Sequence, residues 1–282
     1  MLIFFMRLIL FALLFSTVLF AEFALRDVEV AISDIQKDGS AHVKETIRFQ
    51  VIGDYEKSLY ETGFDNNDIL FWANATGIND IKLHINPNVV DLKPNEFALR
   101  PQPLRSCNSG LNLCQGELVL EYTTYPIYNE STDLPVPDTG VFTIEIPKPR
   151  NTRYSINPSA FAFTTTDKGD LRLEKNIYLI IYPPIGAIIK KEDDLNPKPE
   201  NFERVRFPAE PAELRWQDMV LVKFTVIFDV EESLDKEVVE FFSSFFRALE
   251  RKTRGEQGLA ILLIVAILIT GYFYLQKVKS GR

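Results

Sequence analysis

Histidine and cysteine are scarce in this chain, since each occurs only twice among its 282 residues. Most proton-transfer and nucleophilic active sites, and most zinc sites, depend on those two residue types. The chain also lacks a phosphate-binding loop, a dinucleotide-binding glycine pattern, a nucleophile elbow and a zinc-ligand pattern. The sequence therefore predicts a protein that is not an enzyme, with no catalytic residues, no metal site and no cofactor.

Two short motifs resemble parts of active or metal sites. Asp138-Thr139-Gly140 matches the triplet of aspartic proteases, which need two such aspartates, but the chain has one copy and Pro137 precedes it. The run Asp65–Asp68 offers oxygen ligands for calcium but lacks the full spacing of a calcium loop. Both patterns are also typical of turns, and we expect turns in both places.

The two cysteines lie close together, at Cys107 and Cys114. Nearby thiols pair outside the cytoplasm, and closing so short a loop stabilises a fold by about 2–3 kcal/mol. A metal site would need histidine nearby, and neither His42 nor His84 adjoins the pair. We therefore predict a disulfide with a purely structural role.

Both ends of the chain carry apolar runs. Residues 259–275 are uncharged and apolar, and as a helix they would span about 26 Å, near the lower limit for crossing a bilayer. We predict a transmembrane helix at 258–276 and a basic cytoplasmic tail at 277–282. Residues 8–21 form a shorter apolar run after Arg7, which predicts a signal peptide at 1–21 or, alternatively, an uncleaved anchor. The intervening part is then extracytoplasmic, on a single-pass protein of the cell membrane.

That intervening part is acidic. The whole chain carries a net charge of −8, and the predicted ends contribute only the four basic residues Arg7, Lys277, Lys279 and Arg282, which leaves −12 for the rest. An acidic surface repels nucleic acid, so we expect no nucleic-acid partner. The expected partners are the membrane and a further protein in the membrane or envelope.

Alternating apolar and polar residues dominate the middle of the chain. The pattern predicts strands at 28–32 and 43–51 around an Asp-Gly turn, and further strands whose residue ranges are 78–85, 116–124, 141–146, 160–166, 177–182 and 220–230. Many short strands with turns between them favour sandwiches. Because prolines follow residue 146, we predict two β-sandwich-like domains, at 22–150 and 151–231.

Two residues within these strands need a separate interpretation. Glu45 falls on the apolar face of the 43–51 strand, so it lies either at a sheet margin, which we favour, or beside a basic partner. Trp216 precedes the last strand and is expected in the core rather than in a ligand platform.

A phenylalanine-rich segment separates the β region from the apolar run. Apolar residues recur at helical spacing from Ser233, which predicts a short amphipathic juxtamembrane helix within 232–257. This helix either packs on the second domain, lies on the bilayer or contacts a membrane partner. Its candidate interaction residues are Phe241, Phe242, Phe245 and Phe246.

Asn74 and Asn129 each begin an Asn-X-Ser/Thr sequence, the acceptor pattern for N-glycosylation. The pattern is consistent with an exported domain. Both asparagines are therefore candidate glycosylation sites.

The opening strands, residues 28–40 and 43–49 with the hairpin Asp38-Gly-Ser40 and the Val43-x-Glu45 strand, resemble an uncharacterised family of predicted bacterial and archaeal membrane proteins. That resemblance implies an exported β-domain on a membrane stalk and implies no activity. Members of the family commonly carry further membrane helices, whereas this chain has one predicted span.

Two function classes follow from these features. The first is a non-catalytic, membrane-anchored extracytoplasmic protein whose β-domains serve binding or envelope assembly. The second is an accessory subunit of a membrane complex, docked through the phenylalanine-rich helix and the span. Its plan is similar to that of ribophorin-type subunits of oligosaccharyltransferase, at the level of architecture alone.

Overall fold

The computed structural model describes residues 22–132, 134–148, 150–202 and 206–231. Contacts divide the chain into two units, Met1–Val230 and Glu231–Arg282, so nearly all described residues belong to the first. None of the helices in the described ranges is long and apolar enough to cross a bilayer. The predicted signal peptide, juxtamembrane helix, transmembrane helix and tail all lie outside the described residues.

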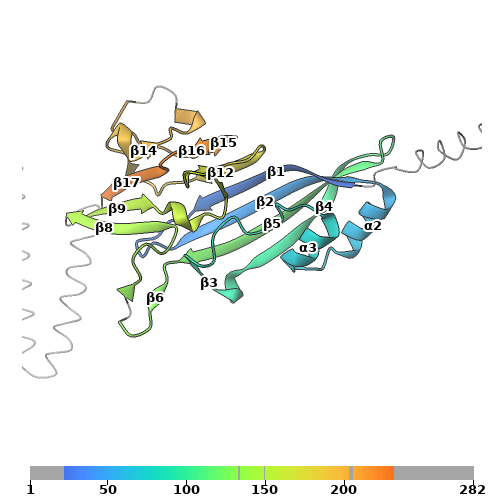
Figure 1. Cartoon of the computed structure of the whole chain (residues 1–282), viewed down its shortest axis with the longest axis horizontal. Coiled ribbons are helices and arrows are strands. Elements are labelled where there is room, and N and C mark those ends of the chain that lie inside the picture. The colour runs from blue at the N-terminus through green and yellow to red at the C-terminus, as the bar shows by residue number, and fades with distance from the viewer. Residues whose placement is uncertain (1–21, 133, 149, 203–205, 232–282) are drawn as a thin grey trace, which may run out of the picture. The chain divides into compact units, whose positions relative to one another are not determined.

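The described part is mainly β, as predicted. Its main sheet has the order β15-β12-β1-β2-β5, with β3 and β4 both pairing with the far edge of β5 (Figure 1). All described pairs are antiparallel except β1 with β12. The bounds of these strands are β1 Glu22–Ser33, β2 Ala41–Ile52, β3 Asp91–Leu92, β4 Ala98–Asn108, β5 Leu113–Tyr125, β12 Ile177–Ile181 and β15 Leu214–Gln217.

A second sheet has the order β13-β17-β9-β8, with β14 also pairing with β17. Two small sheets complete the described strands, in the orders β10-β11-β16 and β6-β7. The bounds are β6 Tyr128–Asn129, β7 Leu134–Pro135, β8 Phe142–Lys148, β9 Asn151–Ile156, β10 Thr164–Thr165, β11 Leu171–Arg172, β13 Ala187–Ile188, β14 Leu195–Asn196, β16 Val220–Leu221 and β17 Thr225–Glu231. Single 3-10 turns are η1 Pro94–Glu96, η2 Pro158–Ala160, η3 Glu192–Asp194 and η4 Glu200–Phe202.

The two faces of the main sheet differ because side chains alternate along each strand. On β2, Val43, Ile47 and Phe49 are fully buried and define the inner face, while Lys44 and Arg48 point to the outer face. One continuous core cluster combines buried side chains of the inner face with those of the second sheet. Burial of the alternating apolar residues therefore explains why these segments form strands.

Helices α2 (Asp54–Thr62) and α3 (Ile69–Thr76) adjoin the opposite end of the main sheet from β8 and β9 (Figure 1). Rings of Phe49, Tyr60 and Trp72 contact one another in series, with centroid distances of 5.9 and 5.2 Å. The Asp68 carboxylate caps α3 by accepting from a backbone N–H, and Gly77 ends it with a φ of 68°. Neither helix was predicted from the sequence.

The predicted domain boundary at residue 150 needs correction. Strand β12 pairs in parallel with β1, so that Val30 lies opposite Leu179, and β15 extends the same sheet. Segments of both predicted domains thus share one sheet within one compact unit. Pro147 lies within β8, and Lys148 pairs with Asn151, so β8 and β9 are neighbouring antiparallel strands rather than parts of two domains.

Most predicted strands are found, with three exceptions. Residues 78–85 form no strand and contribute only an isolated bridge from Ile85 to Phe161. The expected strand at 160–166 is reduced to the two residues of β10, and the run at 220–230 is divided into β16 and β17. Strand β4 was missed because Pro101 and Pro103 interrupt its pattern.

Candidate functional site

A buried polar cluster lies at the centre of the inner face. Glu45 comes from the middle of β2, Tyr122 from β5, and His84 from the irregular segment between α3 and β3. Their exposed fractions are 0%, 1% and 0%, respectively. Ionisable side chains are rarely buried so fully unless they are paired, so this cluster is the described constellation closest to an active site.

One carboxylate organises this cluster. The backbone N–H of His84 donates to Oε1 of Glu45 at 3.0 Å, and the His84 Nδ1 lies 2.7 Å from Oε2. The Tyr122 hydroxyl also donates to Oε1. The Phe163 ring lies 5.7 Å from the His84 ring, and within the described part of the chain the His84 Nε2 atom has no hydrogen-bond partner.

The electrostatics of the cluster follow from its burial. Burial raises the pKa of Tyr122 well above its usual range, and the charge and hydrogen bond of Glu45 raise it further. Tyr122 therefore stays a donor to Glu45 at all physiological pH values. Because the three side chains are almost completely buried, a substrate has no access to them. The chemical effect of the cluster is to hold the His84 segment against the sheet.

The structure corrects the position expected for Glu45. Its side chain lies in the core rather than at a sheet margin, and His84 is the partner that the alternative required. The sequence signal that could have identified this pair was a carboxylate on the apolar face of a strand, in a chain with only two histidines. Trp216, by contrast, is buried as predicted, and its indole N–H donates to the Pro197 carbonyl at 2.7 Å.

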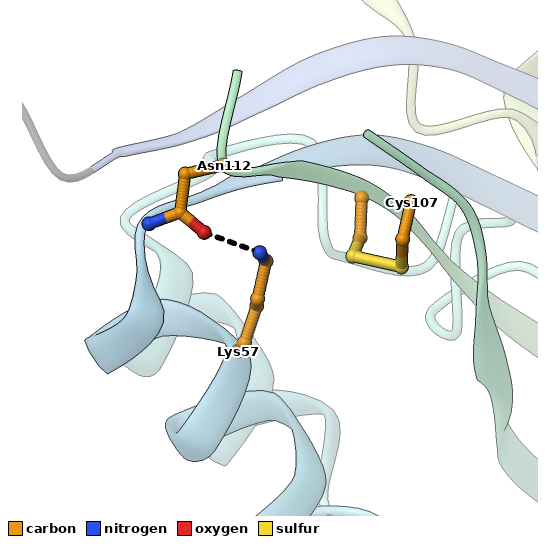
Figure 2. Close-up of a disulfide and its surroundings, with 4 residues drawn as sticks. Lys57, Cys107 and Asn112 are labelled. Atoms are coloured by element: carbon orange, nitrogen blue, oxygen red, sulfur yellow. Dashed lines mark hydrogen bonds between the residues drawn. A yellow bond between two sulfur atoms is a disulfide. The ribbon is translucent and has the colours of Figure 1, made fainter. Parts of the chain in front are cut away.

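The predicted disulfide is present in the structure. Cys107 and Cys114 are joined with an S–S distance of 2.07 Å, between the end of β4 and the start of β5 (Figure 2). The tip of the same hairpin is tied to α2, since Lys57 Nζ donates to the Asn112 side chain and the Gly53 N–H donates to the Asn112 carbonyl at 3.0 Å. The bond therefore fixes a hairpin whose tip also contacts a helix.

Tyr60 adds a second buried polar contact to this end of the sheet. Its hydroxyl lies 2.6 Å from the Gln102 carbonyl oxygen and 2.9 Å from that of Glu117. Burial raises the pKa of Tyr60 to about 12, against a smaller lowering by these backbone hydrogen bonds. Tyr60 thus joins α2 to β4 and β5 through a hydroxyl that stays protonated.

A hollow of about 240 Å³ lies beside the disulfide and is lined by residues of β1, β2, β4 and β5. Arg48 on β2 is one of its lining residues, with its Nη1 atom 2.6 Å from Asp27 and its Nε atom 3.2 Å from Glu117. Burial lowers the pKa of Arg48, but the hydrogen bond and charge of Asp27, with Glu29 and Glu117, raise it more. The lining residues are Arg26, Arg48, Phe49, Pro103, Arg105, Ser106, Gln115, Gly116 and Glu117.

A second hollow of about 260 Å³ lies far from the arginines in sequence, beside η2 and the small sheet of β11 and β16. Its lining includes Asp170, whose carboxylate accepts from the Lys223 N–H at 3.0 Å, and Thr225. Lys223 also lines it, and the remaining lining residues are apolar or glycine, so this hollow offers fewer charged side chains than the arginine-lined hollow.

The candidate glycosylation residues occupy separate elements. Asn74 is exposed on α3, while the hydroxyl of Thr76 in the same acceptor sequence is buried and donates to the Trp72 carbonyl at 2.8 Å. Asn129 is exposed on β6, and its side chain accepts from the Ser131 N–H at 2.9 Å. Use of either site stays a prediction. The four candidate phenylalanines at 241–246 lie outside the described residues.

The two short motifs that resemble parts of active or metal sites both occur in turns. Asp138 and Gly140 have φ angles of 59° and 83°, and the Thr139 hydroxyl donates to the Val136 carbonyl at 2.7 Å. The Asp65–Asp68 run leads into α3, where Asp68 serves as the N-cap. Among the described residues, no group of three or more histidine, cysteine or acidic side chains is arranged to hold a metal ion.

Comparison with known proteins adds no family: no family model matches the chain, and no curated protein matches it.

Proposed function

We propose that this chain is a non-catalytic, membrane-anchored protein whose β-rich part lies outside the cytoplasm and acts by binding or by envelope assembly. The observation that carries this proposal is the closure of the Glu45, His84 and Tyr122 cluster. The described carboxylate, imidazole and hydroxyl that lie together are thus unreachable for a substrate. The protein then acts by binding a partner through its surface.

Two features support the location. The Cys107–Cys114 disulfide suits an oxidising compartment outside the cytoplasm. The uncharged apolar run at 259–275 suits a single transmembrane anchor, and the run at 8–21 suits an export signal. A partner would therefore meet the β-rich part on the outer side of the membrane.

The strand edges suggest how such a partner docks. On the edge strand β4, Pro101 and Pro103 lack the N–H groups that an added strand would pair with. At the opposite edge, the Asn201 side chain donates to the Glu213 carbonyl at 2.7 Å and accepts from the Arg215 N–H at 3.2 Å. These blocked edges favour recognition through a sheet face or a loop rather than through strand addition.

The phenylalanine-rich sequence 241–246 favours a second candidate function, an accessory subunit of a membrane complex. Four phenylalanines within six residues cover more than one face of a helix, so a helix lying on a single sheet would leave part of them uncovered. In this alternative the segment and the apolar run dock against other membrane chains.

Native mass analysis after extraction in mild detergent separates the two candidates. A lone or self-associated chain agrees with the first, whereas a fixed hetero-complex agrees with the second. In the second case, Phe242→Ser with Phe246→Ser should release the partner while barely changing the melting of the β-rich part. Ser243→Ala with Ser244→Ala is the matched control on the same segment and should retain the partner. A loss of several kcal/mol of stability in the phenylalanine variant would instead assign the segment to the core.

A further inference from the structure

We propose that the hollow lined by Arg26, Arg48 and Arg105 binds a small tetrahedral oxyanion, a phosphate or sulfate group. The proposal rests on the proposed function, in which the β-rich part recognises rather than transforms its ligand. To that function it adds the chemical class of ligand that one site on the β-rich part binds. Arg26 and Arg105 in its lining are exposed, so unlike the Glu45 cluster the hollow is open to solvent.

Backbone irregularities bring two of the three arginines to the hollow. The pairing of β1 with β2 shifts between Leu25 and Asp27, which makes Arg26 the extra residue of a bulge. The pairing of β4 with β5 shifts again between Gln102 and Arg105. Bulges redirect side chains and are over-represented beside functional sites. Two separate bulges thus supply guanidinium groups to one hollow.

The wall that carries Arg105 is held in a fixed shape. Ser106 has a φ of 51°, an uncommon conformation for a residue other than glycine, and it is followed directly by the Cys107–Cys114 disulfide. Backbone strain of this kind is found at ligand clamps, where the surrounding structure maintains it. A wall that is already ordered lowers the conformational entropy that is lost on binding.

The three arginines have different partners. Arg48 is fixed by carboxylates, with contacts to Asp27, Glu117 and, at 3.6 Å, Glu29. Arg26 contacts Asp27 at 3.4 Å, but its side chain is 51% exposed. Arg105 is exposed and has no ion-pair partner among the described residues. Arg26 and Arg105 are therefore the cations available to an incoming anion. Arg48 is a third cation, whose position is already fixed by its carboxylate partners.

The charges and donors of the hollow favour a compact oxyanion. Guanidinium groups match the oxygens of phosphate in paired hydrogen bonds, and Ser106 and Gln115 add neutral donors to the lining. Three carboxylates, Asp27, Glu29 and Glu117, equal the three arginines in formal charge, and the whole chain is acidic at −8, so an extended polyanion is disfavoured. We expect dissociation constants of about 1 mM, which corresponds to a modest binding energy.

Thermal melting of the full chain in detergent, at constant ionic strength, tests the proposal. Inorganic phosphate, inorganic sulfate and glycerol 1-phosphate should raise the melting temperature above that in chloride, with saturation in the millimolar range. A stronger effect of glycerol 1-phosphate than of the free ions would identify a phosphate ester as the ligand, and equal effects would identify the free ion.

Matched variants locate the site. Arg26→Ala and Arg105→Ala should each weaken phosphate binding at least fivefold, and Arg105→Lys should restore only part of it because lysine lacks the guanidinium fork. Lys223→Ala, beside the other hollow, should bind as the unaltered chain does. Both arginine side chains are exposed, and a melting temperature in chloride equal to that of the unaltered chain shows that each variant folds. Equal melting in phosphate and chloride, or undiminished binding by the arginine variants, would overturn the proposal. Either result leaves the native-mass test of the proposed function unaffected.

Discussion

The Nδ1 atom of His84 lies 2.7 Å from Oε2 of Glu45, and the exposed fractions of these two side chains are only 1% and 0%. The residues are separated by 39 positions in sequence and come from a strand and from an irregular segment. Their contact lets a segment without regular secondary structure cross the inner face of the main sheet with its polar groups paired. It is the central polar contact of the fold.

Glu45→Ala should lower the free energy of unfolding by about 3–5 kcal/mol, because it leaves the His84 and Tyr122 donors buried without their acceptor. Chemical denaturation monitored by circular dichroism measures the change. Glu121→Ala is the matched control, since Glu121 lies on neighbouring β5 but pairs with Lys44 and Arg100 on the outer face. The control should change stability by less than about 1 kcal/mol. Similar losses in the two variants would contradict the assigned role of Glu45.

Tyr60→Phe should cost about 1–2 kcal/mol, because the carbonyl groups of Gln102 and Glu117 lose the one O–H donor that they share. Since the folded pKa of Tyr60 is about 12 against an ordinary value of 10.0, its contribution is present below pH 10 and is lost as the pH rises toward 12. Unfolding curves between pH 8 and pH 12 should therefore converge for the variant and the unaltered chain. Tyr55→Phe, at a 72% exposed position of the same helix, should have no effect at any of these pH values.

Asp229 should stabilise the fold in a way that depends on acid pH. Burial raises its pKa, but hydrogen bonds from Arg153, Lys190 and Asn151 lower it more, from 3.8 to about 2. Its contribution, on the order of 2 kcal/mol, is thus complete above pH 4 and is lost as the pH falls toward 2. Asp229→Asn should be less stable at pH 7 and equally stable at pH 2. Exposed Asp193→Asn is the control, and a pH-independent deficit in the Asp229 variant would refute this mechanism.

Replacement of Cys107 and Cys114 by serine should lower stability by about 2–3 kcal/mol and leave the fold intact, because the disulfide closes a short loop beside a large core. Melting curves and far-ultraviolet circular dichroism measure both effects. Material taken from the native compartment should show no free thiol under denaturing alkylation. Two alkylatable thiols would show that the bond does not form there.

Local patterns were enough to predict much of the β structure. On β2, alternation of Val43, Ile47 and Phe49 with polar residues identifies a half-buried strand without any knowledge of its neighbours. The cysteine pair was predictable from proximity and compartment alone. Each of these features depends on residues that are close in sequence.

The features that were not predicted depend on distant contacts. Helices α2 and α3 are short, and they are held by packing of Tyr60 and Trp72 against Phe49 rather than by a strong helical repeat. The parallel pairing of β12 with β1 joins segments about 150 residues apart, as Val30 and Leu179 show. Nothing in either segment specifies that partner, so the prolines at 147 and 149 were taken for a boundary.

The candidate site also depends on contacts between residues that are distant in sequence, so it was predicted only in part. Glu45 was singled out because a carboxylate on an apolar face needs an explanation, but its partner His84 sits in a segment that was expected to be a strand. The arginine-lined hollow was not predicted, because two bulges rather than a sequence motif bring Arg26 and Arg105 together.

Protease treatment of intact cells tests the central claim, a membrane-anchored protein with its β-rich part outside, most directly. We expect added protease to remove the β-rich part and to leave a small basic fragment in the membrane, with the tail at 277–282 protected. Cells opened before treatment serve as the control and should lose the tail as well. Survival of the β-rich part in intact cells, with the tail digested instead, would contradict the account.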